Sequence, residues 1–474
     1  MFDKSQTDTL LGKIRDGKPL KTSEKANLII QLSIPSILAQ ITSVLMFYID
    51  ASMVGSLGAE ASASIGLVEP ATWLFASLVI AGAMGFSVQA AHFIGANDFE
   101  RARAVMRHGY IAGLAYSFCL MAIAIFIAPD LPRWLGGGID IQHTASVYFL
   151  IFSFAIPVHL IEYFSAAMLK ASGDMRHPSG IAVMMCLCDV VFNFFLIFPT
   201  RTIALGNFSV EMPGFGLGVQ GAAIGTLLAY VAAAIPLFYY ATYRSSILAW
   251  RIDKKRFVWT WNYVRHATKI GMPMAFQYLL MNGAQVISTM IVAPLGNFSI
   301  AAHSFAITAE SLCYMPGYGI GEAATTLVGQ TVGAKRRDLC KSFAMMAIVM
   351  GMGVMAFMGI VMAAFAPEMI GMLSPVVEIR ELGVSVLRIV AYAEPFFAAA
   401  IIGYSICVGA GDTLRPSVMN LGSMWLVRLT LAYALATTYG LEGIWFAMTV
   451  ELTFRGSLFL HHIYKGKWMH NIAS

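Results

Sequence analysis

Long apolar runs dominate this chain, and short stretches rich in glycine, proline and charged residues separate them. An α-helix needs about 20 apolar residues to cross the hydrocarbon core of a bilayer, and in lipid it satisfies its own backbone hydrogen bonds. Twelve stretches meet this requirement. The predicted spans are residues 27–54, 62–94, 109–128, 143–169, 179–198, 219–241, 269–293, 300–331, 342–365, 382–408, 417–437 and 441–463.

Basic residues gather on one side of this map. Of the 31 Lys and Arg residues, six lie in the N-terminal tail, 17 in the loops after even-numbered spans and two in the C-terminal tail. The opposite side has three, and three more lie within spans. Cytoplasmic loops carry such an excess of basic residues. We therefore expect both termini in the cytoplasm, and the N-terminal tail, which lacks an apolar core, is not expected to be a cleaved signal peptide.

Composition agrees with a membrane protein. The 474 residues are 58% hydrophobic and 12% charged, whereas soluble domains are about 45–50% apolar and about 25% charged. No run of like charges offers a surface for nucleic acid. The six cysteines show neither the spacing of a metal site nor a disulfide framework. The expected fold class is an all-α polytopic membrane protein.

The chain contains an internal duplication at a constant offset of 238 residues. Equivalent positions are six spans apart, and an even number of spans leaves two halves in the same orientation, related by an axis along the membrane normal. Parallel repeats of this kind are typical of transporters, with the substrate path between the halves. The matching pairs include Pro35 with Pro273, Gly95 with Gly333, Gly113 with Gly351, Pro157 with Pro395, Asp174 with Asp412, and Pro178 with Pro416.

The repeat divides the chain into two lobes and three connecting parts. The segment between the lobes, YRSSILAWRIDKKRFVWTWNYVRHAT, is basic and aromatic, and we expect it to form a helix at the membrane interface. The predicted parts are a cytoplasmic tail (1–26), an N-terminal lobe with six spans (27–242), the interfacial linker (243–268), a C-terminal lobe with six spans (269–463) and a second cytoplasmic tail (464–474).

Several motifs resemble the multidrug and toxic compound extrusion (MATE) family of the MOP flippase superfamily. They are IPSILAQITSVLMFYIDASMVGSLG (34–58), ASGDMRHP (171–178), TTLVGQTVGAKRRD (325–338) and GAGDTLRP (409–416), and the resemblance covers essentially the whole chain. It implies two six-helix lobes in a V, a central cavity that opens alternately to each side, and export of organic cations in exchange for H⁺ or Na⁺.

This resemblance also sets the expected partners. The substrates would be small cationic or amphiphilic drug-like compounds, and the surroundings would be the lipids of a bacterial inner membrane. We expect a monomer, with no nucleic-acid partner and no cofactor apart from the coupling ion.

Acidic residues inside the N-terminal lobe are the first candidates for chemistry, because a charge within the bilayer is costly. Depth along the spans, at about 1.5 Å per residue, places Asp50, Asp189, Asn193 and Thr226 together in the outer half of this lobe. Their oxygens suit either a proton relay or a Na⁺ site, although a polar cluster that packs the lobe is the alternative. The MATE resemblance implies a coupling site of the same residue types, with Asn before Asp on helix 5; here Asp189 comes first.

The C-terminal lobe mixes acids with arginines. Glu310, Glu394, Arg428 and Glu451 lie ten to twelve residues from one end of their spans, close to mid-membrane, and Arg455 follows Glu451 by four residues on the same helix face. We expect an ion-pair network that is either structural or has Glu310 or Glu394 in contact with a cationic substrate. The acid that some MATE proteins carry on helix 7 is absent here, so coupling through it is not expected.

Prolines and one further acid complete the candidates. Proline kinks a helix by removing a hydrogen bond, so the repeat-related Pro35, Pro157, Pro273 and Pro395 are candidate hinges, with fixed bends as the alternative. Glu322, toward the cytoplasmic end of span 8, faces either the inward vestibule or a solvated rim.

The leading functional prediction is therefore a multidrug efflux antiporter that works by alternating access. A lipid or lipid-linked oligosaccharide flippase is the related alternative, and fourteen spans with a basic cavity would favour it. The remote alternative is an intramembrane aspartyl protease, because Gly409-Ala410-Gly411-Asp412 spells GxGD. Asp412 falls in a predicted cytoplasmic turn, and neither HExxH nor GxSxG is present. We expect a protein that is not an enzyme.

Overall fold

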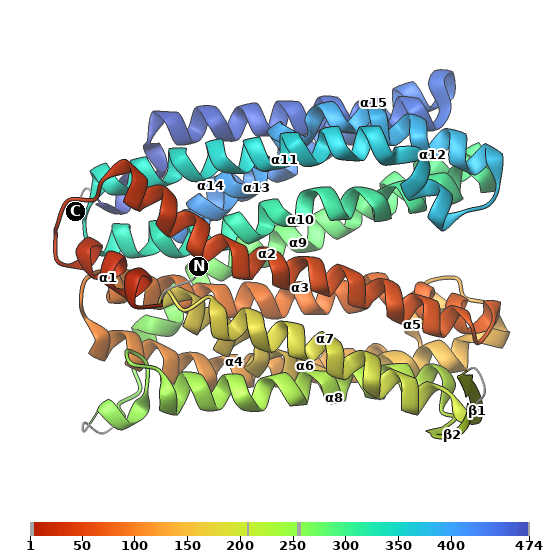
Figure 1. The fold of residues 1–474 in the computed structure, drawn as a ribbon, viewed down its shortest axis with the longest axis horizontal. Helices are drawn as coiled ribbons and strands as arrows, with labels where there is room; N and C mark the ends of the chain where they lie inside the picture. Colours follow the sequence, from red (N-terminus) through yellow and green to blue (C-terminus); the bar gives the residue numbers. More distant parts are fainter. Residues whose placement is uncertain (1–3, 206–207, 254–256, 473–474) are drawn as a thin grey trace.

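A computed structural model describes residues 4–205, 208–253 and 257–472, and it is almost entirely helical (Figure 1). The N-terminal lobe contains α2 (Thr22–Gly55), α3 (Ala59–Gly95), α4 (Phe99–Ile127), α6 (Ile139–Ala171), α7 (Arg176–Ile197) and α8 (Gly218–Tyr239). The C-terminal lobe contains α9 (Trp261–Val292), α10 (Asn297–Gly333), α11 (Arg337–Leu373), α12 (Val377–Val390), α13 (Glu394–Gly409), α14 (Leu414–Gly422) and α15 (Leu429–Lys465).

Shorter elements lie at the two ends of the molecule and at breaks in the long helices. Strands β1 (Pro199–Leu205) and β2 (Phe208–Phe215) form an antiparallel hairpin. We call the end of the molecule with this hairpin the hairpin end, and the end with both chain termini the termini end (Figure 1). The remaining elements are α1 (Lys4–Arg15), α5 (Leu131–Trp134), η1 (Tyr240–Arg244), η2 (Trp250–Ile252), η3 (Ala293–Leu295), η4 (Ala391–Ala393), η5 (Ser423–Arg428) and η6 (Lys467–Ile472).

The prediction of twelve spans in two six-helix lobes is confirmed. Within the described residues, ten helical segments are long and apolar enough to cross a membrane, and Leu414–Lys465 contains two spans because the chain turns at Gly440. The φ of 59° at Gly440 is one that L-residues rarely adopt. The twelfth span is α10, which is less apolar because most of it is buried against α2, α3, α11 and α13 rather than facing lipid.

The two lobes lie side by side and diverge toward the hairpin end, which gives the predicted V shape (Figure 1). At the termini end α2 and α3 of the first lobe pack against α9 and α10 of the second. The hydrogen bonds that cross this junction include a symmetric pair: His92 Nε2 lies 2.8 Å from the carbonyl oxygen of Gly409, and Gln330 Nε2 donates to the carbonyl oxygen of Ala171 at 2.9 Å. Under the 238-residue offset His92 corresponds to Gln330 and Ala171 to Gly409, so the repeat makes the same bond twice.

The closest backbone approach between the lobes obeys the same symmetry. A Cβ atom on Gly95 would lie 2.0 Å from the carbonyl oxygen of Gln330, and one on Gly333 would lie 1.8 Å from that of His92. Both glycines are therefore needed where α3 crosses α10. The duplicated sequence thus folds into two halves related by an approximate two-fold axis that passes between the lobes.

The N-terminal tail contains a helix that packs against the rest of the protein. Within it, α1 buries Leu10, Leu11 and Ile14 against the junction of the lobes. Lys13 Nζ donates to Glu24 Oε1 at 2.6 Å, and this bond to an ammonium lowers the pKa of the Glu24 carboxyl. An amphipathic helix thus covers the termini end.

The linker does not form the helix that we expected over residues 243–268. Its described part contains the end of η1, the single turn η2 and the first residues of α9, which begins at Trp261. Asp253 instead holds the linker to α4, accepting from Arg103 Nε at 2.8 Å and lying 3.6 Å from Arg107 Nη2. Ion pairs with α4 therefore replace helical hydrogen bonds in fixing this segment.

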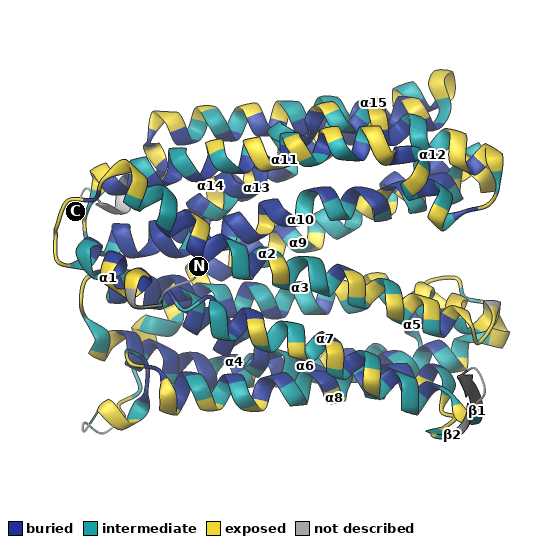
Figure 2. Cartoon of the chain, in the orientation of Figure 1, coloured by how far each residue is buried: buried dark blue, intermediate teal, exposed yellow. Residues whose placement is uncertain are grey.

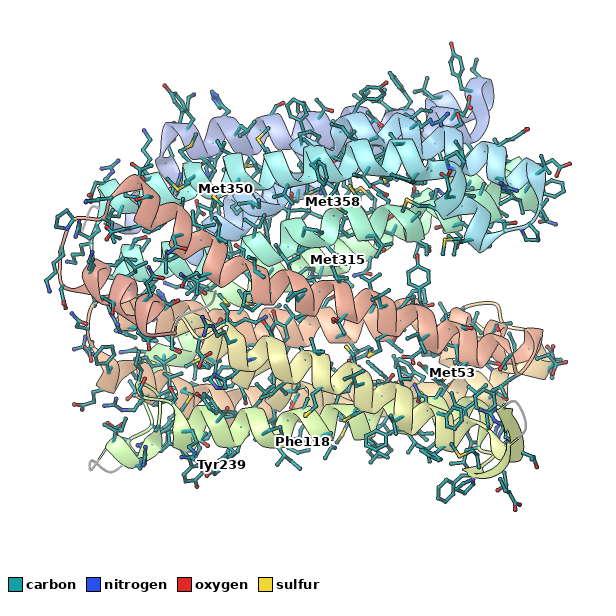
Figure 3. All side chains as sticks on the ribbon, in the orientation of Figure 1. Met53, Phe118, Tyr239, Met315, Met350 and Met358 are labelled. Carbon is teal, nitrogen blue, oxygen red and sulfur yellow. The ribbon has the colours of Figure 1, made fainter. Side chains whose placement is uncertain are left out.

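Both lobes expose many residues along their helices (Figure 2), and large hydrophobic side chains are common among them. Phe118 and Tyr239, marked on the N-terminal lobe in Figure 3, are about half exposed, and Phe126, Ile235 and Phe357 are more exposed still. Water would make such a surface unfavourable, whereas lipid does not. The chain is an integral, multi-pass membrane protein.

Candidate functional site

Three of the four predicted coupling residues meet inside the N-terminal lobe. Asn193 Nδ2 on α7 donates to Asp50 Oδ1 on α2 at 2.9 Å and to Asp189 Oδ2, one turn away on α7, at 3.0 Å. The carboxyl groups of Asp50 and Asp189 are close enough for their charges to interact, and Asp189 Oδ1 is buried without a hydrogen-bond partner among the described residues. Two carboxyl groups can share a hydrogen bond when one of them carries a proton. This geometry therefore suits a pair that holds one proton between two oxygens.

The fourth residue, Thr226, closes the cluster from α8. Its hydroxyl contacts Asp189 and also lies 3.2 Å from the carbonyl oxygen of Ala222. Asp189 and Asn193 are completely buried, whereas Asp50 is partly exposed. A Cβ atom on Gly225 would lie 2.0 Å from Asn193 Oδ1, so glycine at this position leaves room for the amide. The structure thus brings together the four residues that depth along the spans placed at one level.

A cavity of about 300 Å³ adjoins this cluster, and Asp50, Asn193 and Thr226 reach its wall while Asp189 lies behind them. Two tyrosines also line it, Tyr148 on α6 and Tyr230 on α8. The sequence analysis did not identify these tyrosines, because an aromatic residue in an apolar span carries no signal of which way it points.

Charge in this cavity is acidic. Glu69 on α3 lies in its wall and accepts from Trp73 Nε1 at 3.3 Å. Among the described residues no Lys or Arg lies within 4 Å of Asp50, Asp189 or Glu69. Carboxylate, amide and hydroxyl oxygens are the ligands of hard cations and the partners of protons. The residues fit either coupling ion, and the described part of the chain has no cluster of three His, Cys, Asp or Glu side chains that could hold a metal ion more tightly.

In the C-terminal lobe the structure pairs Glu451 with Arg455. Arg455 Nε lies 2.9 Å from Glu451 Oε1 and its Nη2 donates to Oε2 at 3.1 Å, while Ser423 donates to Oε1 at 2.6 Å. All three side chains are buried. The (i, i+4) spacing predicted this contact. One guanidinium hydrogen bond, the close Nε contact and the serine hydroxyl together neutralise and satisfy the carboxylate, although Nε itself makes no hydrogen bond among the described residues.

Arg428 does not join this ion pair. Its Nη2 lies 2.8 Å from Met448 Sδ, and among the described residues no carboxylate oxygen lies within 4 Å of its nitrogens. The charges of Glu451 and Arg455 act on it from further away. The expected single network of three acids and two arginines is therefore corrected to one compact ion pair with a neighbouring arginine.

Glu310 and Glu394 form a second acidic pair. They are 3% and 0% exposed, their charges interact, and no Lys or Arg of the described chain lies within 4 Å of either. The Cys313 thiol lies beside Glu394. With three acids and two arginines close to mid-membrane in this lobe, at least one carboxylate must lack a partner, and among the described residues the geometry leaves two.

The four prolines differ in their effect on the helices. Pro35, Pro157 and Pro273 lie inside α2, α6 and α9, which continue through them. Before Pro395 the chain changes to the 3₁₀ turn η4, and α13 starts at Glu394. Hinge motion at these positions remains a prediction, and Pro395 is the one at which the helix type changes.

The sequence model of the MatE family matches residues 35–195 and 273–434, two segments that begin 238 residues apart. The chain belongs to the MatE family. The resemblance noted in the sequence is thereby confirmed, and MatE is a family of transporters rather than of enzymes.

Several curated relatives match most of this MatE chain. A probable multidrug resistance protein NorM of Thermotoga maritima is 25% identical over 449 residues, which are 93% of this chain and 92% of the relative. A probable multidrug resistance protein NorM of Pseudomonas syringae pv. tomato is 25% identical over 437 residues, covering 90% and 91%.

Solved structures confirm the MatE fold. A crystal structure of MATE in the straight conformation has a TM-score of 0.86 at 19% identity and covers 98% of each chain. An outward-facing multidrug resistance MATE transporter of the MOP superfamily has a TM-score of 0.86 at 19% identity, covering 95% of this chain and 97% of that one. A MOP superfamily transporter from Pyrococcus furiosus, described as having a binding pocket of reverse polarity, also scores 0.86, at 18% identity and 98% coverage of each chain. The same fold therefore hosts cavities of different charge.

Proposed function

We propose that this protein is a secondary active multidrug efflux transporter that exports organic cations and cationic amphiphiles in exchange for H⁺ or Na⁺. The observation that carries the proposal is the Asp50–Asp189 pair, which lies within the predicted spans beside a cavity and has no basic residue of the described chain to neutralise it. A buried carboxylate without a counter-charge needs a proton or a cation. Exchanging that ion for a cationic substrate gives antiport.

The orientation follows from charge. Most of the Lys and Arg residues lie at the termini end, so we place this end in the cytoplasm and the hairpin end outside the inner membrane of a bacterium. The lobes are joined at the termini end and diverge toward the hairpin end (Figure 1). In this orientation the conformation is open to the outside, the state in which substrate leaves and the coupling ion enters. One chain supplies both lobes, which supports a monomer as the working unit.

The flippase alternative differs in the charge of its cavity. Lipid-linked oligosaccharides carry phosphate, and an anion would be repelled by Asp50 and Glu69 in the wall of the N-terminal cavity. The lining of that cavity therefore favours a cationic substrate over an anionic one.

The test is transport by purified protein in proteoliposomes. Ethidium movement is measured with an imposed proton gradient, with an imposed sodium gradient and with neither, and vesicles without protein serve as the control. Ethidium movement driven by a gradient supports the proposal, and the gradient that is effective, of protons or of sodium ions, identifies the coupling ion. Translocation of a fluorescent phospholipid without any ethidium transport would instead favour the flippase.

A further inference from the structure

A second cavity, of about 380 Å³, lies between the lobes nearer the termini end. Four tyrosines line it, together with one basic and one acidic side chain. The tyrosines come from α6, α9, α10 and α13, so both lobes contribute. These residues are Tyr163, Lys170, Tyr278, Tyr318, Glu322 and Tyr404. We call this space the interlobe chamber.

One ion pair crosses the interlobe chamber from lobe to lobe. Lys170 Nζ, from the end of α6, lies 2.8 Å from Glu322 Oε1 on α10, and Gln40 Nε2 on α2 lies 3.3 Å from the same oxygen. The other oxygen, Glu322 Oε2, is buried and has no hydrogen-bond partner among the described residues. One oxygen of Glu322 is therefore bound to Lys170 and Gln40, and the other can accept a hydrogen bond from a ligand.

The backbone around Lys170 is fixed to the opposite lobe as well. Thr326 Oγ1 on α10 donates to the carbonyl oxygen of Lys170 at 3.0 Å, and Gln330 Nε2 donates to that of Ala171 at 2.9 Å. These bonds hold the end of α6 against α10 and direct the lysine toward Glu322. Any motion that separates the lobes at the termini end must break both the bonds and the ion pair.

The internal repeat shows that closing this junction does not require a charge pair. Under the 238-residue offset Lys170 corresponds to Val408 and Glu322 to Met84, and both of these apolar side chains also line the interlobe chamber. One side of the two-fold axis is thus closed by valine and methionine, and the other by lysine and glutamate. Because the apolar pair closes the same kind of contact, the charged pair has a further role.

We propose that Glu322 binds the organic cation when the interlobe chamber is open at the termini end, and that Lys170 is a built-in competitor that takes the place of the cation when the lobes close there. This inference rests on the proposed function for the class of substrate. Tyrosine rings beside a carboxylate are the surroundings that an organic cation prefers, through cation–π contact and charge. In this structure the ammonium of Lys170, 2.8 Å from Glu322 Oε1, takes the position beside the carboxylate that a bound cation would need.

The arrangement links affinity to conformation. A ligand shifts a conformational equilibrium only by the difference in its affinity for the two states. In the open state Glu322 has lost Lys170 and attracts a cation, whereas in the closed state Lys170 neutralises Glu322 and the cation is released. Lys170 thereby supplies the difference in affinity that export requires.

Binding to purified protein in detergent tests this without any need for transport. The probe is tetraphenylphosphonium, measured by equilibrium dialysis, and a neutral aromatic dye serves as a second ligand. Lys170→Gln should bind tetraphenylphosphonium more tightly than wild type, on the order of tenfold, because the competitor is gone. Glu322→Gln and the double variant Lys170→Gln/Glu322→Gln should both bind it weakly, and the neutral dye should be little affected throughout.

Two further variants serve as controls. Lys25→Gln removes another lysine that crosses between the lobes, whose Nζ donates to Ser342 Oγ at 2.9 Å, but involves no acid; binding should stay at the wild-type level. Lys170→Val/Glu322→Met copies the residues of the other half of the repeat, and it should keep the wild-type melting temperature while binding the cation weakly. These two variants separate loss of charge from loss of the junction.

The inference is overturned if Lys170→Gln binds the cation no more tightly than Lys25→Gln, or if its tighter binding persists after Glu322→Gln is added. Ethidium efflux by wild-type proteoliposomes is measured in parallel. Tighter binding by Lys170→Gln without efflux by wild type would refute the proposed transport and leave the Lys170–Glu322 competition standing. Efflux by wild type with unchanged binding in Lys170→Gln would support the proposed transport and refute the Lys170–Glu322 competition.

Discussion

The N-terminal and C-terminal lobes share one fold, but the side chains that surround their buried acids differ. In the first lobe Asp50 and Asp189 lie together with one amide, and no arginine or lysine in the described part of the chain lies within 4 Å. In the second lobe Glu451 is held by Arg455 in a close, hydrogen-bonded ion pair. The duplication therefore gives both lobes the same arrangement of helices but not the same ionisable residues. The buried acids of the two lobes lie at positions that the 238-residue offset does not relate.

A third arrangement lies between these two. Glu310 and Glu394 share the C-terminal lobe with the arginines, yet no basic side chain among the described residues lies within 4 Å of either, as in the first lobe. Comparing the three acidic groups therefore separates acids that a basic side chain neutralises from acids that are left for an ion or a substrate. The predictions below test that separation.

The largest effect is expected from Asp189→Asn. The substitution keeps the shape of the side chain and its contact with Asn193 but removes a group that can bind a proton or Na⁺. Gradient-driven ethidium efflux should fall to the level of vesicles without protein, at normal abundance. Glu69→Gln is the matched control, because Glu69 lines the same cavity but is bonded to Trp73, and it should keep most of the rate.

Combining this change with Asp50→Asn tests whether the two acids form one site. Residues that act as a unit do not contribute independently, so the double variant should be little worse than either single variant. Losses that multiply would assign Asp50 and Asp189 to separate roles.

The next effect concerns stability. Arg455→Ala leaves Glu451 buried without its partner, which costs about 3–5 kcal/mol in protein interiors. The variant should melt early in detergent, and adding Glu451→Gln should restore part of the loss. Arg388→Ala is the control, because Arg388 also lies in a predicted span but is exposed and bonds one carbonyl oxygen. Equal melting of the two variants would show that the ion pair does not stabilise the lobe.

A smaller effect on stability is expected for Glu310→Gln and Glu394→Gln. Neither acid has a basic partner to strand, so each variant should fold with a melting temperature at or above that of wild type. Binding of a cationic dye should weaken or change in range if these acids contact substrate. Early melting with normal dye binding would assign the acid to the scaffold.

The smallest effect is expected for Arg428→Met. Methionine is of similar length, and replacing a buried charge by a well-packed apolar group is often neutral. Since no carboxylate oxygen of the described chain lies within 4 Å of Arg428, thermal melting should change less than for Arg455→Ala. A loss as large as that of Arg455→Ala would mean that Arg428 neutralises Glu451 or Glu310 from a longer distance.

The sequence predicted those parts of the molecule that depend on patterns along the chain. Apolar runs predicted the spans, a constant offset predicted the two related lobes, and (i, i+4) spacing predicted the contact of Glu451 with Arg455. Depth along the helices was sufficient to bring Asp50, Asp189 and Asn193 together, because each is near the same level of adjacent helices in one lobe.

Contacts that depend on the direction in which a helix face points could not be predicted in this way. Depth placed Arg428 level with Glu310 and Glu394, but it says nothing about rotation around the helix axis, and the arginine lies beside Met448 instead. The Lys170–Glu322 pair joins residues 152 apart in the sequence and has apolar counterparts in the repeat, so neither periodicity nor symmetry indicated it.

If the unneutralised acids of the N-terminal lobe couple export to an ion gradient, Asp50→Asn must separate export from the gradient. In the same proteoliposomes, ethidium is followed both as gradient-driven export and as exchange across the membrane without a gradient. The account predicts that Asp50→Asn loses the response to the gradient but still exchanges ethidium, because the fold and the interlobe chamber are intact. Gradient-driven export at the wild-type rate by this variant, at wild-type abundance, would contradict the account.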